Sequence, residues 1–220
     1  VVWWWGWCLW VVGGVFCGCG CLGGLFWVCC VFVSDTATCD VYTRCREEAV
    51  PISLGARTAA MNEPYEDSPG NCGNIIFTQE ELDELFAFFD QHQMQAAVHC
   101  IGDRAMDMVI EAIAKSSYRK DNAKGRHGIV HCQITNPRIL RAMKENDILA
   151  YIQPVFVDLD MNTVEPAIGT HRMEGIYAWK TMLDLGIHAS GGSDAPVVSF
   201  AAMANIHFAV NSKNTNGEPN

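Results

Sequence analysis

Short apolar runs that end in a polar residue and lead into a helical pattern recur along the chain. In the first of them an apolar run ends at His99, and after Gly102 the segment DRAMDMVIEAIAK has apolar residues at helical spacing. We expect Asp103 to cap this helix. The second run ends at His131 and leads into a helical pattern that Pro137 opens. Strands and helices that alternate in this way are typical of a parallel α/β fold.

Two further units follow the same pattern. One apolar run ends at Gln153, and another leads to Asp194. Between them the segment MEGIYAWKTMLDLG predicts a helix that stops at Gly186. Because the carboxyl ends of parallel strands meet at one edge of a sheet or barrel, we expect His99, His131 and Asp194 to face a common point.

Imidazole and carboxylate groups at one point favour a metal site. Neutral histidines and a carboxylate are ligand types that Zn²⁺ or a similar divalent cation accepts. The alternative for a single histidine is a half-buried side chain without a ligand. For the other histidines of the chain we expect such a half-buried position or an exposed one; they are His92, His127, His171, His188 and His207. His207 is expected on the apolar face of a late helix.

Six segments resemble the metal-dependent amidohydrolases in their order and spacing: SLGARTAAMNEPY, VHCIGDRAMD, RHGIVHCQI, AYIQP, YAWKTMLDLGI and GGSDAPV. The resemblance is to the amidohydrolase-3 branch, which contains N-substituted formamide deformylases, and it runs from about Ser53 to about Gly217. It implies a (β/α)8 barrel with one or two divalent metals at its mouth. We therefore expect residues 53–220 to form the C-terminal half of such a barrel.

The resemblance also implies roles for individual residues. His99 and His131 match the metal ligands of the fifth and sixth strands, and Asp194 matches the eighth-strand carboxylate. Asp194 would also take the proton from a metal-activated water that attacks a carbon–nitrogen bond of a small, non-peptide amide. Arg57 matches a position near the site and is predicted to orient substrate, with a loop-tethering role as the alternative.

Residues 1–52 are predicted to be a separate unit. Residues 1–33 contain only Val, Trp, Gly, Cys, Leu and Phe, the six amino acids that codons built from G and T can encode. This composition indicates that the tract is translated low-complexity DNA, or the product of a faulty gene model, fused to the enzyme sequence. The alternative is a membrane anchor, since about 20 apolar residues span a bilayer.

Two absences limit what this chain can do. The family's first-strand His-x-His occurs nowhere in the sequence, and no residue is assigned to its fourth-strand lysine or glutamate ligand. We therefore expect the chain alone to bind metal weakly and to lack turnover. The alternatives to a metal-dependent hydrolase are an inactive fragment with no function of its own and a membrane-anchored binding protein. The net charge of −10 argues against a nucleic-acid partner. The cysteines outside the tract form no disulfide pattern, which favours a cytoplasmic enzyme.

Overall fold

The computed structural model describes residues 53–92, 94–117, 126–195, 197–199 and 201–211, together with the backbone of four strands before them. Those four strands pair antiparallel in chain order: β1 (Val2–Trp4), β2 (Trp7–Val12), β3 (Val15–Leu22) and β4 (Leu25–Val28). Residues 29–52, where the predicted boundary between the two units falls, lie outside the described part. Among the described residues, no helix is long and apolar enough to cross a membrane.

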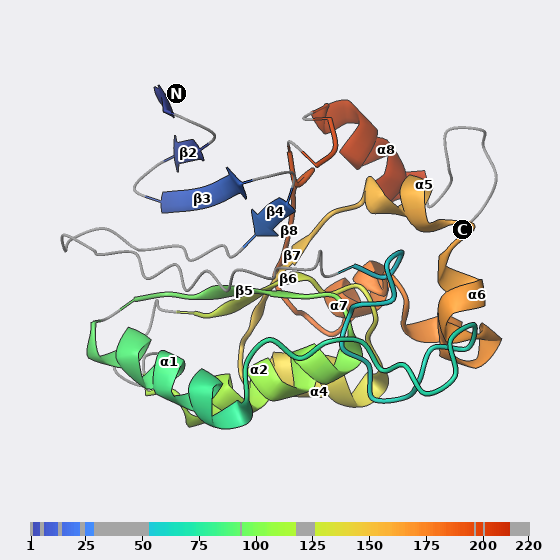
Figure 1. The fold of residues 1–220 in the computed structure, drawn as a ribbon, viewed down its shortest axis with the longest axis horizontal. Coiled ribbons are helices and arrows are strands. Elements are labelled where there is room, and N and C mark those ends of the chain that lie inside the picture. Colours follow the sequence, from blue (N-terminus) through green and yellow to red (C-terminus); the bar gives the residue numbers. More distant parts are fainter. Residues whose placement is uncertain are drawn as a thin grey trace.

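A parallel sheet forms the centre of residues 53–211 (Figure 1). Its strands lie in chain order: β5 (Ala97–Cys100), β6 (Gly128–His131), β7 (Leu149–Ile152) and β8 (Ala189–Gly191). Each strand coincides with one of the four apolar runs of the sequence. The predicted parallel α/β arrangement is therefore confirmed.

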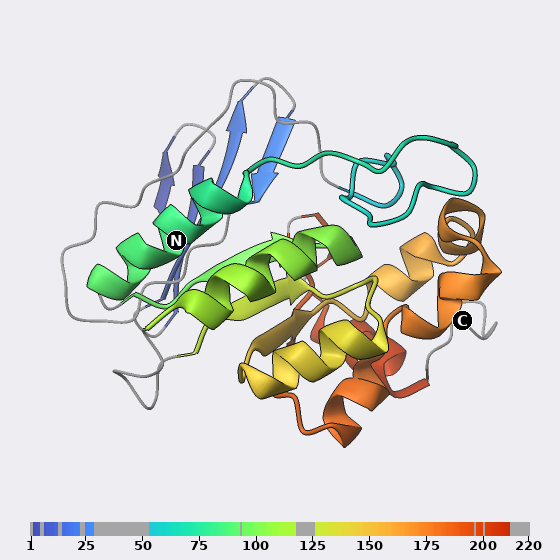
Figure 2. The ribbon, with the colours of Figure 1, turned by 90° about the horizontal axis from the view of Figure 1, so that it is seen from below.

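Helices follow the strands and complete the α/β pattern. They are α1 (Gln79–Gln91), α2 (Asp103–Lys115), α4 (Pro137–Glu145), α5 (Phe156–Asp160), α6 (Val164–Ile168), the 3-10 helix η1 (Thr170–Gly175), α7 (Trp179–Asp184) and α8 (Ala202–Asn211). Figures 1 and 2 show α1, α2 and α4 along one face of the sheet.

Local chemistry sets where two of these helices begin. Thr78 and Glu81 form a reciprocal capping box at the start of α1. Asn136 accepts hydrogen bonds from the first backbone amides of α4, and Pro137 occupies the first turn as predicted.

The structure corrects two local predictions. Gly102, rather than Asp103, occupies the N-cap position of α2. The single helix expected over residues 173–186 is divided into η1 and α7, because Ile176 bridges to Ile134 and Tyr177 has a positive φ of 46°. His207 lies on the late helix α8, as expected, and its side chain is exposed.

Two apolar clusters hold the fold together. The larger lies between the sheet and its covering helices and contains Phe86, Met106 and Ile129, each at most 1 % exposed. The smaller joins Tyr65 of the predicted loop 62–74 to Ile101 and other residues beyond the strand ends. This loop therefore packs against the carboxyl ends of the strands, where the candidate site lies.

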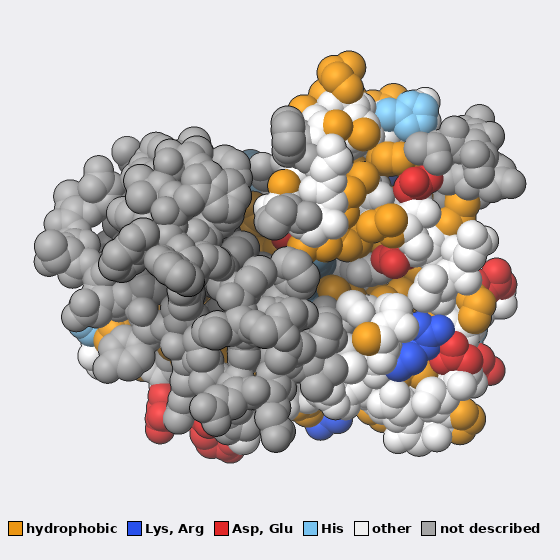
Figure 3. All heavy atoms as spheres, turned by 45° about the horizontal axis from the view of Figure 1, so that its top comes forward, with side chains coloured by type: hydrophobic (Ala, Val, Ile, Leu, Met, Phe, Trp, Pro, Cys, Tyr) orange, Lys and Arg blue, Asp and Glu red, His pale blue; other side chains and the backbone are white. Residues whose placement is uncertain are grey.

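The last helix keeps part of its apolar surface open. Met203, Ile206 and Val210 on α8 are each more than half exposed, and Figure 3 shows apolar side chains gathered on this part of the surface. Its only buried side chain is that of Phe208. The helix is thus held to the described fold along a narrow line of contact.

Candidate metal centre

His99, His131 and Asp194 lie next to one another at the carboxyl ends of the strands. The rings of His99 on β5 and His131 on β6 meet edge to face, with their centroids 4.5 Å apart. His131 Nε2 lies 4.0 Å from Oδ2 of Asp194, which follows β8. The Phe156 ring contacts His131 with centroids 5.6 Å apart. The expected convergence of the three predicted residues is therefore present, with His131 in the middle.

The backbone is unusual at two of these residues. His131, the next residue Cys132, and Asp194 have positive φ values of 74°, 49° and 60°. Non-glycine residues rarely adopt this left-handed region, and each such residue is strained by about 1–3 kcal/mol. In register, His131 pairs with Cys100, whereas its ring contacts His99. The positive φ values of His131 and Cys132 thus end the regular strand β6 at the residue whose ring contacts His99.

Burial sets the charges of the three groups. Burial lowers the pKa of His99 to about 4, and burial together with the nearby His99 lowers the pKa of His131 well below its usual value. Burial raises the pKa of Asp194 to about 6. At pH 7 both imidazoles are therefore neutral, with a lone pair available, and the carboxyl group is mostly ionised.

The donor chemistry of this set fits a divalent metal, but His131 and Asp194 are too far apart for a closed site. Two neutral imidazoles and a carboxylate are zinc ligands, and ligand atoms around tetrahedral Zn²⁺ lie about 3.3–3.5 Å apart. The 4.0 Å between His131 and Asp194 exceeds this spacing. Among the described residues, no three His, Cys, Asp or Glu side chains already have metal-binding geometry.

A polar cluster behind His131 was not predicted from the sequence. The Gln133 side-chain amide donates to Asp160 Oδ2 at 2.6 Å and to the Tyr177 hydroxyl at 2.9 Å, and this hydroxyl also donates to Asp160. Burial raises the pKa values of both Asp160 and Tyr177. The cluster joins the exit of β6 to α5 and to the segment before α7. Its members are far apart in the chain, so no local pattern indicated it.

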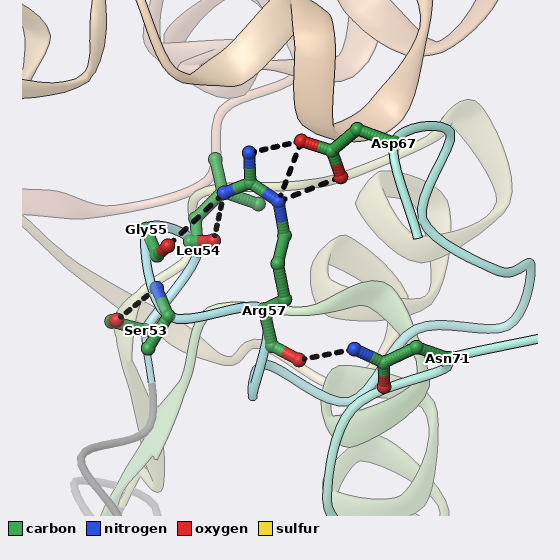
Figure 4. Close-up of polar contacts among 7 residues, drawn as sticks. Ser53, Leu54, Gly55, Arg57, Asp67 and Asn71 are labelled. Carbon is green, nitrogen blue, oxygen red and sulfur yellow. Dashed lines mark hydrogen bonds and ion pairs between the residues drawn. The ribbon is translucent and has the colours of Figure 1, made fainter. Parts of the chain in front are cut away.

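Arg57 is engaged by its own loop (Figure 4). Its guanidinium pairs with the Asp67 carboxylate, and Nη1 donates to the carbonyl oxygens of Leu54 at 2.8 Å and Gly55 at 3.2 Å. The Arg57 carbonyl oxygen accepts from the Asn71 side chain at 3.1 Å. These contacts are the ones that the loop-tethering alternative expects. Substrate contact by Arg57 stays a prediction.

Comparison with known proteins gives one family. Residues 46–219 match the model of the amidohydrolase family. The Bacillus subtilis (strain 168) protein YtcJ, an amidohydrolase by name, is 35 % identical over 159 residues, which are 72 % of this chain and 29 % of YtcJ. The Arabidopsis thaliana protein LONG AFTER FAR-RED 3 is 28 % identical over 159 residues, 72 % of this chain and 27 % of that protein. This chain thus spans less than a third of either relative.

Solved structures give the same result. An uncharacterized metal-dependent hydrolase from Pyrococcus furiosus aligns with a TM-score of 0.63 and 29 % identity over 72 % of this chain and 32 % of that chain. A second, from Pyrococcus horikoshii, aligns with a TM-score of 0.64 and 24 % identity over 76 % of this chain and 32 % of that chain, which supports the fold. With its parallel sheet and the family match over most of its length, the chain belongs to the amidohydrolase family, in the amidohydrolase-3 branch.

Proposed function

We propose that this chain carries the C-terminal part of the site of a metal-dependent hydrolase that cleaves carbon–nitrogen bonds in small, non-peptide amides. The observation that supports this most strongly is the meeting of His99, His131 and Asp194 at the ends of three parallel strands. Membership of the amidohydrolase family supports the reaction class.

In this proposal His99, His131 and Asp194 hold the divalent metal, with zinc as the first candidate and one or two ions in a complete site. A bound ion of this kind polarises a carbonyl group and acidifies water to a pKa near 7. The two imidazoles, both neutral at pH 7, contribute lone pairs without bringing positive charge to the site. The Phe156 ring against His131 excludes water from one side of that imidazole.

Asp194 is the proposed proton carrier. Its carboxylate takes a proton from the attacking water and passes it to the nitrogen of the leaving amine, so that the carbonyl carbon gains oxygen and loses nitrogen. Its position after β8 places it beside His131 and on the side opposite β5 in the strand order.

We further propose that the chain by itself has no turnover. His-x-His is absent from the sequence, and the spacing at the strand ends is wider than a closed zinc site requires. Tight metal binding needs ligands that rigid elements and supporting residues hold in place. In the described sheet, His99 and Asp194 belong to the two edge strands and only His131 lies on an inner strand, so this support is weak.

An extended protein with a first-strand His-x-His placed before residue 53 tests the proposal. With Zn²⁺ or Mn²⁺ added, we expect it to hydrolyse N-substituted formamides or cyclic amides. Replacement Asp194→Ala should lower the rate at least 100-fold, while the matched Asp184→Ala, on the exposed end of α7, should leave it unchanged. Full activity of the Asp194→Ala protein would contradict the assigned role.

A further inference from the structure

Gln153 presents a buried hydrogen-bond acceptor that no residue in the described part of the chain uses. The residue is 7 % exposed, and no donor of the described residues reaches its Oε1 atom. An unsatisfied buried polar atom is unfavourable by about 1–3 kcal/mol, so such atoms call for an explanation. Among the described residues, the other buried side-chain atom of this kind is Trp179 Nε1, which lies on α7 within the core on the helix side of the sheet.

The strand register places Gln153 among the candidate site residues. His99 pairs with Val130, and Val130 pairs with Tyr151. Side chains alternate along a strand, so Gln153, two residues after Tyr151, continues the same face as His99, one step nearer the carboxyl ends. In the strand order Gln153 follows β7, between the strand that carries His131 and the strand that leads to Asp194.

Backbone contacts hold Gln153 in this position. Its carbonyl oxygen accepts from the Phe156 backbone amide at 3.1 Å, and the Phe156 ring contacts His131. On the other side, the Gly192 amide donates to the carbonyl of Ile152 at 2.9 Å, which keeps the segment before Asp194 close to β7. The backbone of Gln153 is therefore held by the same elements that position two of the candidate metal ligands.

We propose that Gln153 contacts substrate, with Oε1 accepting a hydrogen bond from an N–H group of the bound amide. The ligand class is thus a primary or secondary amide in preference to a tertiary one. The identity of the ligand as an amide rests on the proposed function; the position of the unused acceptor does not. A site with a fixed acceptor discriminates against a ligand without a donor, because that acceptor then stays buried and unpaired.

Binding of two small probes to the purified chain tests this inference without requiring turnover. N-methylformamide has one N–H group, and N,N-dimethylformamide has none. We expect NMR titrations to give about 10-fold tighter binding of N-methylformamide, which corresponds to one net hydrogen bond. Gln153→Met should bind both probes alike. It should also unfold at the same temperature as the parent or higher, since it removes an unsatisfied polar group.

The matched control is Gln95→Met, at the opposite end of the sheet, where Gln95 contacts the Tyr151 hydroxyl at 3.4 Å. This variant should keep the preference for N-methylformamide. Equal binding of both probes by the parent, no binding of either, or a preference that survives in Gln153→Met would overturn the inference. A stability loss in Gln153→Met would likewise assign the residue to the core. If the N–H preference holds while the extended protein lacks hydrolase activity, the proposed function fails and the contact at Gln153 stands.

Discussion

Two buried histidines, His127 and His131, and the half-buried His99 show how surroundings separate structural from candidate functional residues. His127 is 3 % exposed; its Nδ1 accepts from the Ala96 backbone amide at 3.1 Å, and its Nε2 lies 3.1 Å from the Ser116 hydroxyl. Protein groups thus use both ring nitrogens of His127. His99 and His131 have lowered pKa values as well, but they meet each other and Asp194 at the strand ends.

The first prediction concerns His127 and pH. Burial lowers its pKa to about 4, below the usual value of 6.5, so the folded state favours the neutral ring. Its contribution is complete above pH 6.5 and is lost as the pH falls towards 4, by about 3 kcal/mol in total. We expect urea unfolding to show that His127→Gln depends less steeply on pH in this window than the parent. The exposed-site variant His207→Gln should follow the parent; an unchanged pH dependence in His127→Gln would contradict the assignment.

The second prediction concerns Arg57. If Arg57 tethers the loop through Asp67, loss of either partner should have the same effect on stability. Arg57→Gln and Asp67→Asn should each lower the thermal midpoint of unfolding. The double variant should be no less stable than the less stable of the two single variants. In the extended protein, Arg57→Gln and Asp67→Asn should change KM by the same amount. A rise in KM for Arg57→Gln that Asp67→Asn does not share would show that Arg57 contacts substrate.

At the scale of elements, the junction between β5 and α2 explains why the apolar run breaks at Gly102. The Ala60 carbonyl oxygen accepts from the backbone amides of Arg104 and Ala105 at 3.2 and 3.4 Å, in the first turn of α2. A loop distant in sequence thus caps this helix, and Asp103 instead accepts from the Asn62 amide. A Cβ atom at Gly102 would lie 2.0 Å from the Ala60 oxygen, so only glycine permits this approach.

The third prediction follows from this contact. Gly102→Ala should destabilise the fold by about 1–3 kcal/mol, because the capping loop must move away from α2. Gly55→Ala is the matched control, since no atom lies within 4 Å of its added Cβ, and it should change the free energy of unfolding by less than about 0.5 kcal/mol. Equal stability of the two variants in urea unfolding would contradict this account of the junction.

The sequence predicted the elements well and their long-range contacts poorly. Apolar periodicity located β5, β6 and β7, and the helices α2 and α4 that follow the first two, because these signals are local. The short helices α5 and α6 after β7 were not predicted. The cap of α2 by Ala60 and the cluster of Gln133, Asp160 and Tyr177 join residues that are 17 to 45 positions apart, so no local pattern contains them. His99, His131 and Asp194 were predicted because parallel topology brings strand ends together.

At the scale of the whole molecule, the described sheet has two free edges. Among the described strands, β5 and β8 each pair with one neighbour. The first of them carries His99, and Asp194 follows the second, so two of the three candidate ligands belong to edge strands. Closed barrels abolish such edges and hold their inward side chains rigidly. The chain spans less than a third of its curated relatives, and we propose that the described strands alone hold the three candidate ligands too loosely for tight metal binding.

Zinc affinity tests the central claim most directly. We expect calorimetric titration of the chain alone to show weak binding, and the extended protein with first-strand His-x-His to bind Zn²⁺ stoichiometrically. In that protein, His131→Ala or Asp194→Ala should weaken binding at least 100-fold, because each removes a ligand. The exposed-site variant His207→Ala should leave the affinity unchanged. Undiminished affinity after loss of His131 and of Asp194 would show that these strand ends are not the metal centre.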